Sequence, residues 1–141
     1  MKKLTLLITL LLVIGGCSKE VPSDQLVERG GLLYEVNSQT PFTGSVVDYY
    51  ENGQLKEKGN IKDGKLNGLS EFYYDNGQLK EKGNIKDGMR DGLYESYYEN
   101  GQLKEKRNYK EDQLHGLWEY YYENGQPGIA RLYKDGEEIP Q

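Results

Sequence analysis

The chain has 141 residues, of which 29% are charged and 35% hydrophobic, with thirteen Tyr against two Phe and one Trp. This length suits one domain rather than two. The formal net charge of −5 at pH 7 argues against sequence-independent binding to nucleic acid or anionic lipid headgroups, because both favour clustered Lys and Arg. The single cysteine, Cys17, excludes an intrachain disulfide framework.

Residues 1–16 have the pattern of an export signal. Lys2 and Lys3 give a basic start, and the apolar run over residues 4–14 contains no charge. This run is shorter than the about 17 residues that a membrane-spanning helix needs, and its length is typical of a signal-peptide core. We therefore predict that residues 1–16 are removed as a signal peptide.

The apolar run ends in Ile14-Gly15-Gly16-Cys17, which resembles the lipobox of bacterial lipoproteins. The resemblance implies cleavage before Cys17, a lipid on its thiol and acylation, for example by palmitate, of the new amino terminus. Two acyl chains hold a protein at a membrane where one is marginal. We expect a bacterial envelope protein with a polar tether over residues 17–27, and Ser18 favours the outer membrane if the cell has one. The alternative is an ordinary signal peptide or a short membrane helix, with Cys17 incidental.

Two sequence markers recur with a constant period of 24 residues. Asn-Gly pairs begin at Asn52, Asn76, Asn100 and Asn124, and the second marker is Asp63-Gly64, Asp87-Gly88, Glu111-Asp112 and Asp135-Gly136. A fixed period of this size indicates a repeat architecture. We assign residues 49–141 to tandem repeats with a C-terminal cap, and residues 28–48 to a degenerate first repeat.

Both markers predict tight turns between β-strands. Asn-Gly and Asp-Gly favour two-residue type I′ turns, in which both central residues have φ > 0. Two strands and two such turns account for the 24 residues of a unit, so each unit is predicted to be one antiparallel hairpin. The predicted fold class is all-β, an elongated antiparallel β-meander of tandem hairpin repeats. Around Asn76, this pairing sets Tyr74 opposite Leu79 and Phe72 opposite Glu81.

Alternation of side chains gives the predicted sheet two faces. The aromatic face carries a column of tyrosines and, at a position that is Val or Ser in earlier units, two larger rings: Tyr50, Tyr74, Tyr98, Tyr122, Tyr94 and Trp118. The opposite Lys–Glu face pairs Glu71 with Lys82 and places Tyr73 beside Lys80. Nothing in the chain is predicted to cover the aromatic face, and exposed apolar patches commonly mark partner sites. We expect this face to bind an envelope protein or a second copy of the chain; packing within the sheet is the other interpretation of its rings.

The units, for example GLSEFYYDNGQLKEKGNIKDG from Gly68 and GLYESYYENGQLKEKRNYKED from Gly92, resemble the MORN repeat (membrane occupation and recognition nexus). They are most similar to the variant found in the YwqK-like antitoxin family and in many bacterial lipoproteins. The resemblance implies an elongated meander with an aromatic-lined face, and it implies lipid binding, protein scaffolding or dimerisation. In the last unit, Pro127-Gly128-Ile129-Ala130 replaces Leu-Lys-Glu-Lys, which suits an edge strand and a C-terminal cap.

No residue pattern favours a catalytic, metal or cofactor site. His115, the single histidine, stands beside a turn where earlier units have Asn or Asp, and no Ser lies in a recognisable nucleophile elbow. Glu57, Glu81 and Glu105 form a column, but alternate strands are roughly 9–10 Å apart, too far for shared ligation of one metal ion.

These features predict a non-enzymatic protein-binding scaffold that a lipid anchors in the envelope. Two alternatives remain open. The first is an antitoxin of a toxin–antitoxin system, which the family resemblance suggests and the export signal opposes. The second is an envelope hydrolase, which would require clustered acid–base residues.

Overall fold

The computed structural model describes residues 19–140. Over this range the protein is all-β, and consecutive hairpin strands form most of one long antiparallel sheet, which confirms the predicted fold class. The elements are β1 (Glu20–Pro22), the 3-10 turn η1 (Ser23–Gln25), β2 (Leu26–Arg29), β3 (Leu32–Glu35), β4 (Gly44–Tyr49), β5 (Leu55–Lys62), β6 (Lys65–Tyr73), β7 (Leu79–Lys86), β8 (Met89–Tyr97), β9 (Leu103–Lys110), β10 (Gln113–Leu114), β11 (Gly116–Tyr121), β12 (Pro127–Lys134) and β13 (Glu137–Ile139).

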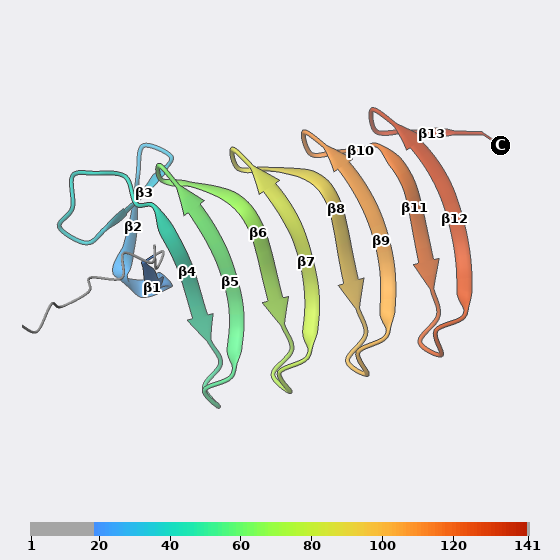
Figure 1. Ribbon diagram of the computed structural model, residues 1–141, viewed down its shortest axis with the longest axis horizontal. Coiled ribbons are helices and arrows are strands. Elements are labelled where there is room, and N and C mark those ends of the chain that lie inside the picture. Colours follow the sequence, from blue (N-terminus) through green and yellow to red (C-terminus); the bar gives the residue numbers. More distant parts are fainter. Residues whose placement is uncertain (1–18, 141) are drawn as a thin grey trace, which may run out of the picture.

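The main sheet has eleven strands in the order β1-β4-β5-β6-β7-β8-β9-β11-β12-β13, with the short β10 also paired to β9. From β4 onward the chain advances as a curved meander along the long axis (Figure 1). β1 is the exception, because it pairs parallel to β4. β2 and β3 form a separate two-stranded sheet at the β4 end. The Asp-Gly turns follow one long edge of the main sheet and the Asn-Gly loops follow the other, so we call these the Asp-Gly edge and the Asn-Gly edge.

The Asp-Gly turns are two-residue type I′ turns, as predicted. Asp63 and Gly64 have φ values of 51° and 82°, and Lys62 and Lys65 face each other across the turn. The turn over residues 111–112 has the same form without glycine, with φ values of 49° and 66°. Because a left-handed conformation costs a non-glycine residue roughly 1–2 kcal/mol, the paired strands on either side must impose this last turn.

The Asn-Gly loops differ from the predicted type I′ turn. In the loop after β6 the glycine alone has positive φ, 84° at Gly77. Tyr74 closes the loop, because its N–H donates to the Gln78 carbonyl and its carbonyl accepts from the Gly77 N–H. Asn76 explains the wider shape: its Oδ1 accepts the Gln78 N–H at 2.9 Å, a side-chain turn that competes with the two-residue form.

The wider loop shifts the strand register beside it. A bulge follows Phe72, so that Tyr73 rather than Tyr74 faces Leu79, and the predicted pairing of Tyr74 with Leu79 is wrong. Phe72 faces Glu81 as predicted, because the bulge lies between that pair and the loop. The same shift recurs in the following hairpins, between residues 96 and 97 and between residues 119 and 121.

Residues 19–43, called the N-terminal cap below, cover the first hairpin of the meander. Val21, Phe42 and Ile61 are 3–4% exposed and form the buried cluster of the protein. Leu26 and Leu33 of the cap pack against this cluster. The cap therefore supplies a second layer at the β4 end of the sheet.

The predicted polar tether over residues 17–27 is wrong where the structure describes it. Val21 is buried on β1, and Leu26 packs on the core. The predicted first repeat over residues 28–48 is likewise divided, because β3 belongs to the small sheet and β4 begins the meander. Val21 and Leu26 lie in a largely polar stretch and gave little local signal, and only their contacts with distant strands show their role.

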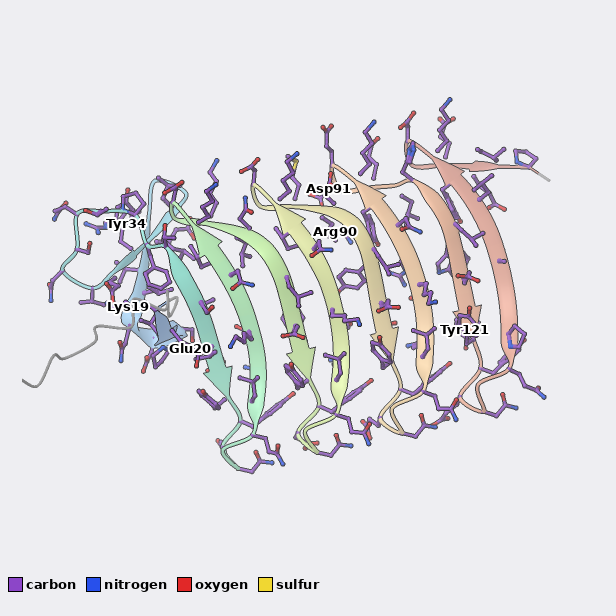
Figure 2. All side chains as sticks on the ribbon, in the orientation of Figure 1. Lys19, Glu20, Tyr34, Arg90, Asp91 and Tyr121 are labelled. Atoms are coloured by element: carbon purple, nitrogen blue, oxygen red, sulfur yellow. The ribbon has the colours of Figure 1, made fainter. Side chains whose placement is uncertain are left out.

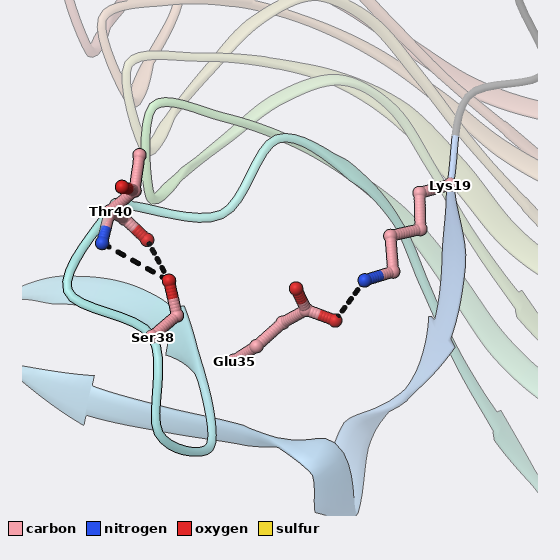
Figure 3. A network of polar contacts seen from close by, with 4 residues as sticks. All are labelled: Lys19, Glu35, Ser38 and Thr40. Carbon is pink, nitrogen blue, oxygen red and sulfur yellow. Dashed lines mark hydrogen bonds and ion pairs between the residues drawn. The ribbon is translucent and has the colours of Figure 1, made fainter.

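Polar contacts hold the loops of the cap (Figure 3). The Lys19 ammonium forms an ion pair with the Glu35 carboxylate, which joins the start of the described chain to the end of β3. In the loop after β3, the Ser38 hydroxyl donates to the Thr40 carbonyl at 3.0 Å and accepts the Thr40 N–H at 3.1 Å. The cap is therefore an ordered part of the fold.

Beyond the cap and the first hairpin, the sheet is a single layer. Among the described residues, Tyr109 is the one buried hydrophobic side chain in this part, with 8% of its surface exposed. No helix within residues 19–140 has the length and apolar character needed to cross a bilayer.

Candidate interaction face

The repeated tyrosines of the aromatic face join one unit to the next. Each lies in an Asn-Gly loop, and its hydroxyl donates to a backbone carbonyl 23 residues further along: Tyr50 to Tyr73 at 2.7 Å, Tyr74 to Tyr97 at 2.8 Å and Tyr98 to Tyr121 at 2.9 Å. The Tyr98 hydroxyl also lies 3.1 Å from the Tyr120 hydroxyl, and the hydrogen bond between these two groups raises the pKa of Tyr98 to about 12. Tyr122, in the last Asn-Gly loop of the described residues, is 51% exposed. The main role of Tyr50, Tyr74 and Tyr98 is therefore to join neighbouring units of the sheet.

The loop asparagines form a second ladder beside the tyrosines. Their side-chain amides donate to carbonyls of the next loop: Asn52 to Asp75 at 2.9 Å, Asn76 to Glu99 at 3.4 Å and Asn100 to Glu123 at 3.1 Å. Each asparagine thus shapes its own loop and contacts the next one. The 24-residue period is a structural requirement at this edge.

Tyr74→Phe should lower the free energy of unfolding by about 1 kcal/mol, because it leaves the part-buried Tyr97 carbonyl without its donor. Tyr122→Phe is the matched control, and its effect should stay within about 0.5 kcal/mol because Tyr122 is an exposed residue. Urea unfolding followed by circular dichroism compares the two. Equal effects would show that the ladder contributes nothing to stability.

Strand register aligns one residue from each strand across the middle of the aromatic face. This central row is Val46, Gly59, Ser70, Gly83, Tyr94, Arg107, Trp118 and Arg131. Its first four members are small and its last four are large. The central row of the aromatic face consequently carries small side chains near the N-terminal cap and large side chains over β8 to β12.

Tyr94 fills the middle of this face. Its ring stands over Gly83, where a Cβ atom would come within 2.3 Å of it, and its hydroxyl donates to the Glu81 carboxylate. Burial, and then this hydrogen bond, raises the pKa of Tyr94 far above its usual value. Tyr109 packs edge-on against the same ring, with centroids 6.0 Å apart. Tyr94 is thus half-buried and held in one orientation.

Three arginines that were not predicted as binding residues complete the aromatic face over β8 to β12. Arg90 lies 4.2 Å from the Tyr109 ring centroid, and its Nε donates to the Asp112 carboxylate at 2.9 Å. This hydrogen bond lowers the pKa of Asp112. Figure 2 shows Arg90 on β8 towards the Asp-Gly edge, and Tyr121 on β11 towards the Asn-Gly edge.

The other two arginines occupy the central row. The Arg131 guanidinium lies 5.5 Å from the Trp118 ring centroid and donates a hydrogen bond to the Glu138 carboxylate at 3.1 Å. Arg107 forms an ion pair with Glu105. An alignment of the units could have identified Arg107 and Arg131 as candidates, because both positions correspond to glycine in earlier units. Arginine and large aromatics are the residues that protein interfaces most often use as anchors.

The Lys–Glu face differs from its prediction in two contacts. Glu71 faces Lys82 in the register, but the Lys82 ammonium pairs with Glu95 at 2.9 Å. Burial opposes ionisation of Glu95, but the hydrogen bond from Lys82 lowers its pKa below the usual value. Lys80 lies 5.7 Å from the Tyr74 ring rather than beside the preceding tyrosine, because the bulge changes the register there.

The other candidate residues fall into separate positions. His115 lies between β10 and β11, where its Nδ1 is 3.2 Å from the Asp135 carboxylate of the next unit. Glu81 and Glu105 contact Tyr94 and Arg107 respectively. Within residues 19–140, no group of three or more His, Cys, Asp or Glu is placed to hold a metal ion. Cys17 lies outside the described residues.

Fold and surface define a tandem β-hairpin repeat protein whose most distinctive surface is an aromatic and arginine-rich sheet face. The family model of the MORN repeat variant matches residues 42–63, 66–87, 90–111 and 114–135, so the chain belongs to this family. Repeats of this kind are generally protein-binding or membrane-binding modules and typically not enzymes. No curated protein matches the chain significantly.

Proposed function

We propose that the protein is a non-enzymatic binding scaffold of the bacterial envelope, and that its partner is another envelope protein. The proposal rests on one observation, that the large aromatic and arginine side chains of the aromatic face are concentrated in its uncovered part. The N-terminal cap covers its first unit, whereas β8 to β12 present Tyr94, Trp118 and three arginines in a single-layer sheet with nothing over them among the described residues.

The proposed membrane anchor is a lipid on Cys17. The sequence from residue 4 to Cys17 supports it, and Lys19, two residues after Cys17, is the first residue of the cap. A lipid at Cys17 would hold the cap end of the sheet near the membrane and leave the C-terminal units free to reach a partner. The antitoxin alternative has the family resemblance as its support, and an export signal opposes a cytosolic antitoxin.

A crosslinking pull-down from cells that express the full chain tests the proposed binding face. The Tyr94→Ser and Trp118→Ser double variant, in which both positions resemble Ser70, should lose the partner because it removes both large rings. The matched control is Leu93→Ser with Leu117→Ser, the neighbouring residues on the same strands, which face the other side and are 42% and 40% exposed.

Circular dichroism shows first that both variants fold. Loss of one protein with the ring variant, and its retention with the leucine variant, supports the proposal. If both variants recover the same proteins as the parent, the aromatic face is not the binding surface. Recovery of the chain alone would make the face a self-association surface instead.

A further inference from the structure

Three glutamates occupy equivalent positions on the aromatic face, and one of them is unpaired. Glu81 accepts a hydrogen bond from Tyr94, and Glu105 forms an ion pair with Arg107. Glu57, the first of the series, has no hydrogen bond or ion pair with any residue that the structure describes. The ammonium groups of its neighbours Lys56 and Lys58 form their ion pairs with other carboxylates, those of Asp48 and Glu20.

The central row explains why Glu57 is alone. The hydroxyl that reaches Glu81 comes from Tyr94, and the equivalent residue beside Glu57 is Ser70, which is too short. The guanidinium that pairs with Glu105 comes from Arg107, and its equivalent is Gly59. The first unit thus has the carboxylate of this arrangement without either of its two possible partners.

A hollow of about 280 Å³ lies at this place, between the N-terminal cap and the sheet. Its walls are largely apolar and include Leu26 and Leu33 of the cap and Val46, Ile61, Leu66 and Phe72 of the sheet. Glu57 and Gly59 both line it. Because one water molecule takes about 30 Å³ in the liquid, the hollow has room for a whole side chain.

We propose that this hollow receives an arginine side chain of a partner protein, with its guanidinium on Glu57 and its methylenes against the apolar walls. The ion pair of Arg107 with Glu105, two hairpins further along the sheet, is an example of the same contact within this protein. Arginine suits both parts of the site, because its stem packs on apolar surface and its planar head pairs with a carboxylate through two hydrogen bonds. The choice of a protein as the source of the arginine rests on the proposed function.

A short peptide measures the contact directly. Blocked Gly-Arg-Gly, titrated into isotopically labelled protein, should shift the amide resonances of Gly59 and Ser70 and leave that of Gly83, which Tyr94 covers, unchanged. Glu57→Gln should weaken binding at least tenfold, whereas the matched Glu81→Gln should leave it unchanged. Blocked Gly-Gln-Gly should not bind. No shift with the arginine peptide, or equal affinity for the glutamine peptide, would overturn the proposal.

Filling the hollow from within provides a second test that needs no ligand. Gly59 has an ordinary negative φ, and an added Cβ atom would meet the flexible end of Leu66 at 3.0 Å. Gly59→Arg should therefore place a guanidinium on Glu57, abolish peptide binding and raise the urea midpoint. In a double-mutant cycle with Glu57→Gln, the pair should show a favourable coupling of about tenfold in the folding equilibrium constant. Absence of coupling would contradict a site for arginine.

The experiments distinguish a failure of the arginine site from a failure of the scaffold function. If the peptide binds at Glu57 but cells yield no partner protein, the arginine site stands and the scaffold function falls. If a partner is captured equally by the parent and by Glu57→Gln, and the peptide does not bind, the arginine site falls and the scaffold function stands.

Discussion

Phe42→Ala should lower the free energy of unfolding by about 3–5 kcal/mol, the range for removing a fully packed phenylalanine. Phe42 is 4% exposed and joins Val21 of the cap to Ile61 of the sheet. No second hydrophobic layer exists elsewhere in the described chain to compensate for this loss. Urea unfolding monitored by far-UV circular dichroism measures the change.

Phe72→Ala is the matched control, because Phe72 is the only other phenylalanine and is 36% exposed. Its replacement should cost less than about 1.5 kcal/mol. Trp118 fluorescence, at the far end of the sheet, adds a second readout. In a repeat protein each unit contacts only its neighbours, so Phe42→Ala should change the first units more than the signal of Trp118. Equal losses from the two Phe variants would refute the assignment of the core to the cap.

Gly64→Ala should destabilise the protein by about 2–5 kcal/mol, because it combines backbone strain with a steric clash. Gly64 has a φ of 82°, where a Cβ atom costs roughly 1–2 kcal/mol. That atom would also lie 2.9 Å from the Leu32 Cβ and 3.1 Å from the Leu33 backbone nitrogen. Overpacking of this kind typically adds about 1–3 kcal/mol. The backbone of β3 cannot move away without losing the hydrogen bond from Leu33 N–H to the Gly64 carbonyl.

Gly88→Ala separates the cost of backbone strain from the cost of the steric clash. Gly88 has the same place in the next turn and a φ of 86°, but an added Cβ atom would meet nothing within 4 Å. It should therefore show the strain alone, about 1–2 kcal/mol. The difference between the two variants in chemical denaturation measures the contact of the cap with the turn. Equal effects would show that the cap does not press on Gly64 in solution.

Local rules predicted much of the repeat. The pairing of Phe72 with Glu81 follows from counting outward from a turn, and the turn at Asp63 and Gly64 has the predicted type I′ form. Both depend on residues close together in the chain. The Asn-Gly loops escaped the same rules because the side chain of Asn76 competes for the backbone N–H of Gln78 and widens the loop. One side-chain hydrogen bond was enough to move Tyr74 out of its predicted pair.

The candidate surfaces were predicted less completely. Tyr94 and Trp118 stood out in the sequence because they replace Val46 and Ser70 of earlier units. Arg107 carried the same kind of signal, since it replaces glycine, but its contact with Glu105 is a matter of side-chain packing on neighbouring strand positions. The tyrosines of the Asn-Gly loops looked like binding residues, and the structure shows that most of them join units through their hydroxyls.

By itself, the sequence determined the period, the hairpins, the membership of an all-β repeat class and the two faces of the sheet, because these depend on turn chemistry and alternation over a few residues. Only the tertiary structure decided that residues 19–43 form a cap, that Val21 pairs beside β4, and that Glu57 faces a hollow. These features bring together residues as far apart in the sequence as Ser23 and Phe72. Their stability comes from burial and packing between distant strands, which leaves little trace in any short stretch of sequence.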